Sequence, residues 1–89
     1  MNDENLVKIF KAVSNERRFL ILKHLFRSKE LTVGQISELI HLSFKSTSRH
    51  LAVLLNAKLV NVKQLDLNRF YSINNLYFPK EFIIFFTKP

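Results

Sequence analysis

The sequence predicts a mostly helical fold with a small β-hairpin, because its hydrophobic periodicity changes once along the chain. As far as about residue 57, apolar residues recur every three or four positions, as on amphipathic helices. Between residues 59 and 73 they alternate with polar ones, as on strands that bury one face. With 89 residues, the chain has room for one small domain, which we place at residues 1–89.

The first two helices are indicated by apolar spacing and by a cap. A helix is expected over about residues 3–13, where the i, i+3, i+4 and i+7 positions are Leu6, Ile9, Phe10 and Val13. Asn15 is a favourable N-cap, so a second helix should begin directly after it and end in the charged stretch RSKE.

Two short helices should follow, joined by a tight turn. Thr32 and Gln35 have the spacing of a capping box, which predicts a third helix over about 33–40 with an apolar inner face of Ile36, Leu39 and Ile40. In the turn, His41 is expected to take the left-handed position and Ser43 to cap a fourth helix over about 44–57. Such a pair of helices forms a helix-turn-helix.

The hairpin and the tail complete the predicted fold. Residues 59–65 and 69–73 are predicted to be two strands around the polar turn 66–68. A helix-turn-helix followed by a hairpin is a winged helix-turn-helix, here with about five helices and a two-stranded wing. The tail PKEFIIFFTKP begins with Pro79 at a suitable first helical position, so we interpret it as a last helix over about 79–87, with a buried strand as the alternative.

Composition limits the functions that the chain can have. The net charge is +7, from 14 basic and 7 acidic residues, which favours a polyanionic partner such as nucleic acid or an anionic membrane surface. The absence of cysteine excludes disulfides and thiolate metal sites. The amino terminus does not resemble a signal peptide, and no apolar run approaches the roughly 18 residues of a membrane span. A cytoplasmic protein is therefore expected.

The fourth helix has a polar outward face when it is projected at about 100° per residue. Thr47 and Leu51 fall on the inward side, whereas the outward side is small and basic: Lys45, Ser48, Arg49 and Ala52, with Ser46 on the flank. Arginine can bind guanine with two hydrogen bonds, serine can bond base edges or phosphate, and lysine neutralises phosphate. This face suits the major groove of DNA, although similar charges also occur on helices that face only solvent.

Four segments resemble the ArsR family of winged-helix transcriptional repressors: VSNERRFLILKHL, ELTVGQISELIHLS, STSRHLAVLLNAKLV and RFYSIN. The resemblance spans about residues 4–74 and is most specific in the Ser-Arg-His-Leu of the fourth helix. It implies a homodimer that binds palindromic operator DNA and releases it when an effector binds. It also implies DNA-reading positions at Lys45, Ser46, Ser48 and Arg49 of the fourth helix, with Arg69 and its neighbours on the wing. We expect Lys63, Asn68 and Arg69 of the wing to bind flanking phosphate or the minor groove.

The sequence departs from the metal-sensing members of the ArsR family. Many of these use cysteines in the third helix or Asp and His on the last helix, whereas LTVGQI has no thiol and PKEFIIFFTKP has neither Asp nor His. His24, His41 and His50 lack metal-ligand spacing, and we interpret His50 as a packed, hydrogen-bonded residue. No metal or cofactor is expected, and no catalytic set or phosphate loop suggests an enzyme.

Phe44 and Gly34 are unusual for their positions. The family usually has a polar residue where Phe44 begins the fourth helix, so we interpret Phe44 as a core-edge residue, with packing against a thymine methyl group or a deoxyribose as the alternative. Gly34 is the only glycine and lies within a predicted helix, where we interpret it as allowing the close approach of a neighbouring helix.

The terminal helices are predicted to form a dimer interface. The helices over about 3–13 and 79–87 are rich in large apolar residues. A two-fold contact between them would place the fourth helices of the two chains about one DNA turn apart. The interface residues that we predict are Leu6, Phe10, Val13, Phe82, Phe85 and Phe86. The alternative is that these side chains only complete the core of one chain.

These patterns predict a homodimeric regulator of transcription, a repressor, that binds double-stranded DNA in a sequence-specific manner. Two other functions fit the same fold: a winged-helix module that binds proteins, and an architectural DNA binder without sequence preference. The sequence leaves open the operator, the direction of regulation and whether an effector is sensed.

Overall fold

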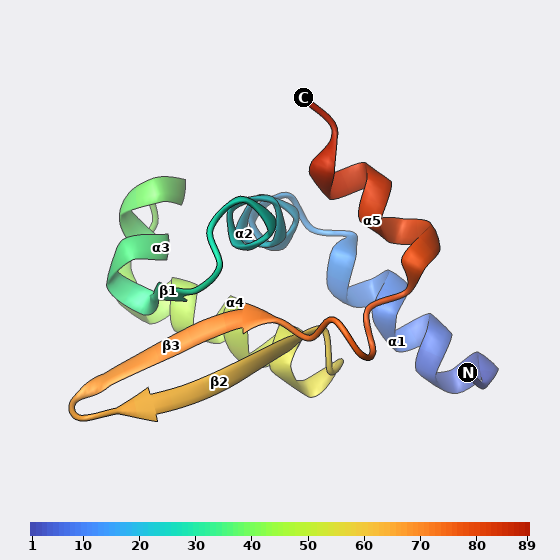
Figure 1. The fold of residues 1–89 in the computed structure, drawn as a ribbon, viewed down its shortest axis with the longest axis horizontal. Coiled ribbons are helices and arrows are strands. Elements are labelled where there is room, and N and C mark those ends of the chain that lie inside the picture. The colour runs from blue at the N-terminus through green and yellow to red at the C-terminus, as the bar shows by residue number, and fades with distance from the viewer.

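The helix boundaries in the computed structural model of residues 1–89 follow the capping residues of the sequence (Figure 1). The helices are α1 Asp3–Val13, α2 Glu16–Arg27, α3 Val33–Ile40, α4 Phe44–Asn56 and α5 Lys80–Thr87. The strands are β1 Leu31–Thr32, β2 Val60–Leu65 and β3 Asn68–Ile73, which pair antiparallel in the order β1-β3-β2. This is a winged helix-turn-helix, as the sequence predicts.

The predicted caps are confirmed in their hydrogen bonds. The Asn15 side chain accepts from the backbone N–H of Arg18 at 3.1 Å and so begins α2. At the start of α3, both bonds of the capping box between Thr32 and Gln35 are present. The Ser43 hydroxyl accepts from an N–H in the first turn of α4. These bonds satisfy N–H groups that a helix start otherwise leaves without partners.

The turn between α3 and α4 has the predicted left-handed residue. His41 ends α3 with a φ of 55°, and its N–H and that of Leu42 bond back to the last turn of α3. This closes the helix with a non-glycine residue, which histidine tolerates better than most side chains do. The sharp turn sets the direction in which α4 leaves α3.

The hairpin is one residue longer on its return strand than the sequence predicts. β3 begins at Asn68, so the turn consists of Asp66 and Leu67, with Asp66 at a φ of 57°.

A third strand, β1, was not predicted; it pairs Leu31 with Tyr71 and Thr32 with Phe70. With only two residues, β1 is too short for a periodicity signal, and one of them also caps α3.

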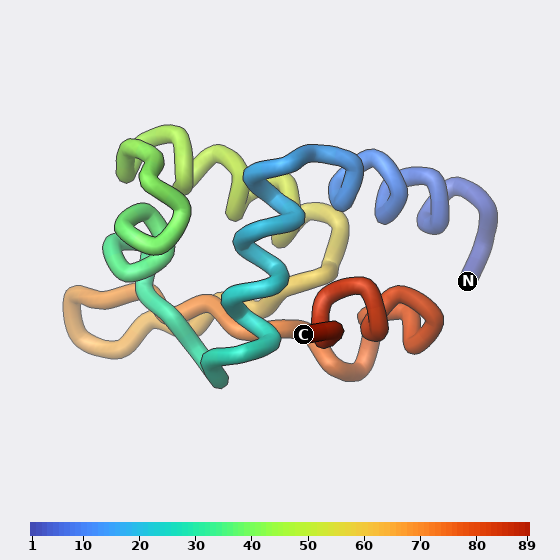
Figure 2. Tube along the Cα trace, turned by 90° about the horizontal axis from the view of Figure 1, so that it is seen from above, coloured from blue at the N-terminus to red at the C-terminus, as the bar shows by residue number.

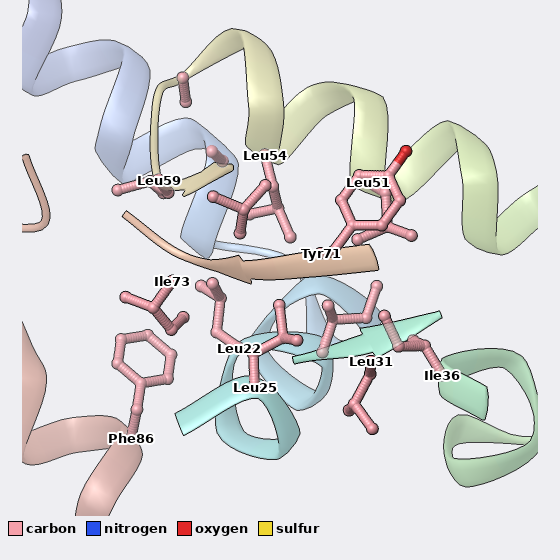
Figure 3. Close-up of a cluster of buried hydrophobic side chains, with 14 of the residues drawn as sticks. Leu22, Leu25, Leu31, Ile36, Leu51, Leu54, Leu59, Tyr71, Ile73 and Phe86 are labelled. Atoms are coloured by element: carbon pink, nitrogen blue, oxygen red, sulfur yellow. The ribbon is translucent and has the colours of Figure 1, made fainter. Parts of the chain in front are cut away.

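The core is centred on α2, which packs against the other four helices and the sheet (Figures 1 and 2). Ile21 and Leu22 of α2 are fully buried, together with Leu51 and Leu54 of α4. Figure 3 shows how apolar side chains from α2, α4, β1 and β3 meet in this cluster. The fold therefore holds α4 by its inward face and leaves its outward face free.

The tail is a helix, and one of its phenylalanines belongs to the core. α5 begins after Pro79, which is the N-cap and not the first helical residue as predicted. The Phe86 side chain is 2% exposed, and its ring centroid lies 4.7 Å from that of Phe19 and 5.6 Å from that of Phe78. Placing Phe86 in a dimer interface was therefore wrong, because the chain's own aromatic residues already enclose it.

Two predictions about α3 are also wrong. Leu39 is 45% exposed and lies outside the inner face that Ile36 and Ile40 form. No helix approaches Gly34 closely, because a Cβ atom there would have only the Oγ1 atom of Thr32 as a neighbour, at 4.0 Å. Both errors arise because α3 is short and is covered by its neighbours on one side only.

Thr47 is the one fully buried polar residue of α4, and its hydroxyl has no hydrogen-bond partner. Replacing Thr47 with valine keeps the branched shape and removes the unpaired hydroxyl, so the free energy of unfolding should rise by about 1 kcal/mol. Urea denaturation measures this change. The control is Thr87→Val, where an exposed hydroxyl bonded to the carbonyl of Ile83 is lost and no gain is expected. A less stable Thr47→Val protein would contradict the prediction.

No helix of the structure combines the length and the apolar character that crossing a membrane would require.

Candidate nucleic-acid interface

The start of α4, the start of α3 and the tip of the hairpin lie at the same end of the molecule (Figures 1 and 2). The terminal helices α1 and α5 lie at the opposite end, where the ring centroids of Phe10 and Phe82 are 5.2 Å apart. The elements that the sequence assigns to DNA and to dimerisation are thus separated along the long axis of the molecule, which measures 36 Å.

The outward face of α4 has the orientation that the helical projection predicts. Lys45 and Arg49 are exposed, and Ser46 and Ser48 are partly exposed. The inward face is formed by Thr47, Leu51 and Leu54, which are fully buried. Because α4 contains no acidic residue, its exposed face has a positive charge along its first two turns.

Residues of the wing divide into two groups. Asn68 and Arg69 are exposed at the tip of the hairpin, at the same end of the molecule as the start of α4. Lys63 instead has its ammonium nitrogen 3.4 Å from a carboxylate oxygen of Glu30, and it lines a hollow that also includes Phe26 of α2. The pair is largely solvated, so it stabilises the fold by less than about 1 kcal/mol. Of the three predicted wing residues, the structure brings only Asn68 and Arg69 near α4.

Phe44 is 62% exposed, so its interpretation as a core-edge residue was wrong. Its angle on the helix is close to that of buried Leu51, but it lies in the first turn, beyond the end of the packed core. It lines a shallow hollow of about 280 Å³ between α3, α4 and the tip of the wing, together with Gly34 and Leu67 among others. Most of the phenylalanine ring is therefore open to solvent beside this hollow.

Two arginines that the sequence interpretation overlooked connect the helices beneath this face. The Nη1 atom of Arg17 donates to the carbonyl of Ile40 at 2.6 Å, at the end of α3. Arg18 donates through Nε to the carbonyl of Ala12 at 2.6 Å and through Nη1 to the Nδ1 atom of His50 at 3.2 Å. These bonds tie α1, α2, α3 and α4 together. A signal was present in the sequence, because two cations in the first turn of a helix oppose its dipole and therefore need another role.

His50 is a packed, hydrogen-bonded residue, as the sequence predicts. Burial lowers its pKa below the ordinary value for histidine, and the positive charges of Arg18 and Arg17 lower it further. Because arginine can only donate, the Nδ1 atom of His50 must accept the bond, which requires the neutral ring. The remaining N–H of the ring is then at Nε2.

The histidine and carboxylate side chains do not form a cluster. No group of three or more His, Asp or Glu side chains is placed to hold a metal ion. Burial is also the main cause that lowers the pKa of His24, followed by the charges of Arg27 and Lys23, but no carboxylate pairs with this ring. The titratable groups therefore form neither a metal centre nor an acid–base pair.

Comparison with known proteins identifies the family. Residues 15–62, more than half of the chain, match the family described as "Bacterial regulatory protein, arsR family". The matched segment begins at the cap of α2 and ends within β2, so it contains the whole helix-turn-helix.

Individual relatives agree with this match. The transcriptional activator HlyU of Vibrio cholerae is 38% identical over 74 residues, which are 83% of this chain and 68% of that protein. The solved structure of its reduced form has a TM-score of 0.78 at 34% identity and covers 96% of this chain and 84% of that chain. The transcriptional repressor PagR of Bacillus anthracis has a TM-score of 0.72 at 29% identity, over 81% of this chain and 82% of that chain.

The capped helix-turn-helix, the wing and these matches lead to one conclusion. The chain belongs to the arsR family of bacterial regulatory proteins, which are winged-helix transcriptional regulators and not enzymes.

Proposed function

We propose that this protein regulates transcription by binding operator DNA as a homodimer, with α4 in the major groove. The observation that carries the proposal is the outward face of α4, where exposed cations and small hydroxyl residues occur without an acidic residue. Such a face fits both the negative potential of DNA and the hydrogen-bonding groups of base edges.

Each residue of this face has a distinct proposed role. The guanidinium group of Arg49 forms bidentate hydrogen bonds with a guanine. Ser46 and Ser48 form hydrogen bonds with neighbouring base edges or phosphates. Lys45, at the very start of α4, neutralises a phosphate at the edge of the groove. At the wing, Arg69 and Asn68 bind the flanking backbone or the minor groove. Lys63 contributes less than Arg69, since its ammonium group already has Glu30 as a partner.

A two-fold contact between the terminal helices completes the proposal. Exposed apolar side chains gather on α1 and α5: Val7 at 50%, Phe10 at 49%, Ile84 at 62% and Phe85 at 55%. Monomeric proteins rarely expose a cluster of large apolar residues of this kind, which favours burial against a second copy. Two half-sites on one face of DNA lie about 34 Å apart, one helical turn, so the half-site spacing of the selected operator tests whether a two-fold dimer presents both α4 helices to one DNA face.

Repression is the direction of regulation that we propose, because a dimer that occupies promoter DNA excludes polymerase from it. The names of the relatives include both directions, since HlyU of Vibrio cholerae is a transcriptional activator and PagR of Bacillus anthracis is a transcriptional repressor. A transcription assay on a promoter that contains the operator measures the direction. Activation in that assay would contradict repression and leave the DNA-binding part of the proposal intact.

Salt dependence of DNA binding tests the proposal against the two other functions. An operator is first selected from a pool of random duplexes. The dimer should make four phosphate contacts, from Lys45 and Arg69 of each chain. A plot of the logarithm of the DNA association constant against the logarithm of the salt concentration should therefore have a slope of roughly −4. A slope near zero would favour a protein-interaction module. A steep slope with equal affinity for the operator and for random DNA would favour an architectural binder.

A further inference from the structure

Phe44 is the only apolar side chain in the first turn of α4, and it is flanked by Ser43 and Lys45. Its exposed fraction of 62% means that most of the ring faces solvent in the free protein. A single exposed apolar residue needs no explanation on most surfaces. This one, however, begins the helix that we propose to enter the major groove, so its surroundings change when DNA binds.

The ring lies next to the proposed base contacts. Phe44 precedes Ser48 by four residues, so it lies one turn before Ser48, at the border between the inward and outward faces of α4. On its other side is the hollow beside Gly34, which leaves the ring accessible from the direction of the wing. Cations lie on both sides of Phe44, at Lys45 and at Arg69, so a DNA strand bound by them passes the ring closely.

The chemistry of the major groove then determines what the ring can contact. Base edges in this groove present hydrogen-bond donors and acceptors and only one apolar group, the C5-methyl group of thymine. Packing the ring against polar edges would remove them from water without providing a partner, which is unfavourable. Packing it against a thymine methyl group buries apolar surface on both sides. Phe44 can therefore favour thymine and disfavour the other bases at one position.

We infer that Phe44 is a specificity-determining residue that reads the 5-methyl group of a thymine in each operator half-site. This inference rests on the proposed function, because it requires α4 to enter the major groove. It adds a contact that differs in kind from those of Arg49 and Ser48, since it depends on apolar burial and not on hydrogen bonds.

The test uses the full-length protein and the selected operator in which thymine is replaced by deoxyuridine, one position at a time. Deoxyuridine differs only by the missing methyl group, and the loss of one buried methyl corresponds to about a fourfold weaker binding. We expect this loss at one thymine of the half-site. The Phe44→Ala protein should bind the thymine and deoxyuridine operators equally, whereas Phe44→Leu should retain part of the difference.

Leu67→Ala is the matched control, because Leu67 is 96% exposed and lines the same hollow but belongs to the wing. The wing reaches backbone or minor groove, where thymine has no methyl group, so this variant should retain the fourfold difference.

If the unaltered protein selects an operator but deoxyuridine has no effect at any position, the inference is wrong and the proposed function stands. If no DNA is bound in a salt-dependent way, the proposed function itself fails. Because the deoxyuridine comparison is made first with the unaltered protein, it does not depend on the folding of any variant.

Discussion

Replacing Arg49 with alanine is expected to weaken operator binding by about 1–3 kcal/mol in each half-site and to relax the preference for one base pair. The Arg49 side chain is exposed and makes no side-chain hydrogen bond or salt bridge within the chain, so the change should leave the fold intact. The loss arises because a guanine that was bound by two hydrogen bonds would keep neither of them. Titration of selected and mismatched duplexes measures both the affinity and the lost preference.

Arg49→Lys separates the contribution of charge from that of base recognition. Lysine keeps the positive charge but lacks the planar guanidinium group that forms two parallel hydrogen bonds. The salt dependence of binding should therefore stay the same, while the preference for guanine falls. Lys45→Ala should behave in the opposite way, with weaker binding to all duplexes and a shallower salt slope. Operator affinity that is unchanged in Arg49→Ala would show that α4 does not read the groove through this residue.

Most of the fold could be predicted because the signals that define it act over short distances. A cap acts within three residues of its own helix, so Asn15, Thr32 and Ser43 indicate three helix starts without any knowledge of tertiary structure. The outward face of α4 follows from helical geometry alone, once its first residue is known. The candidate DNA interface was predictable to the same extent, since it consists of that face and the neighbouring wing tip.

The incorrect predictions concern burial and pairing, which depend on elements that are distant in sequence. The angle of Phe44 on its helix is that of a core residue, but the packed part of the molecule ends before it. The ion pair of Lys63 was not predicted, because its partner Glu30 is 33 residues away in the sequence; the contact of Lys63 with DNA stays a prediction. The role of Arg18 was missed for the same reason, because its partners Ala12 and His50 belong to two other helices.

The neighbours Phe85 and Phe86 should respond very differently to replacement by alanine. Phe86 is enclosed by other aromatic rings, so Phe86→Ala should lower the free energy of unfolding by about 3–5 kcal/mol, a large fraction of the stability of a small domain. Phe85 is 55% exposed in the single chain, so Phe85→Ala should affect the dimer and not the core. Loss of one large apolar contact from each subunit should weaken dimerisation by roughly 2–3 kcal/mol.

Urea denaturation at two protein concentrations distinguishes the two effects. The stability of a dimer rises with protein concentration, whereas the stability of a monomer does not. Phe86→Ala should therefore lower stability at both concentrations, and the milder Phe86→Leu should do so to a smaller degree if the alanine variant does not fold. Phe85→Ala should remove most of the concentration dependence and sediment as a smaller species. If the unaltered protein sediments as a monomer at micromolar concentration, then α1 and α5 only complete the core of one chain, and the two-fold model of operator binding must be abandoned.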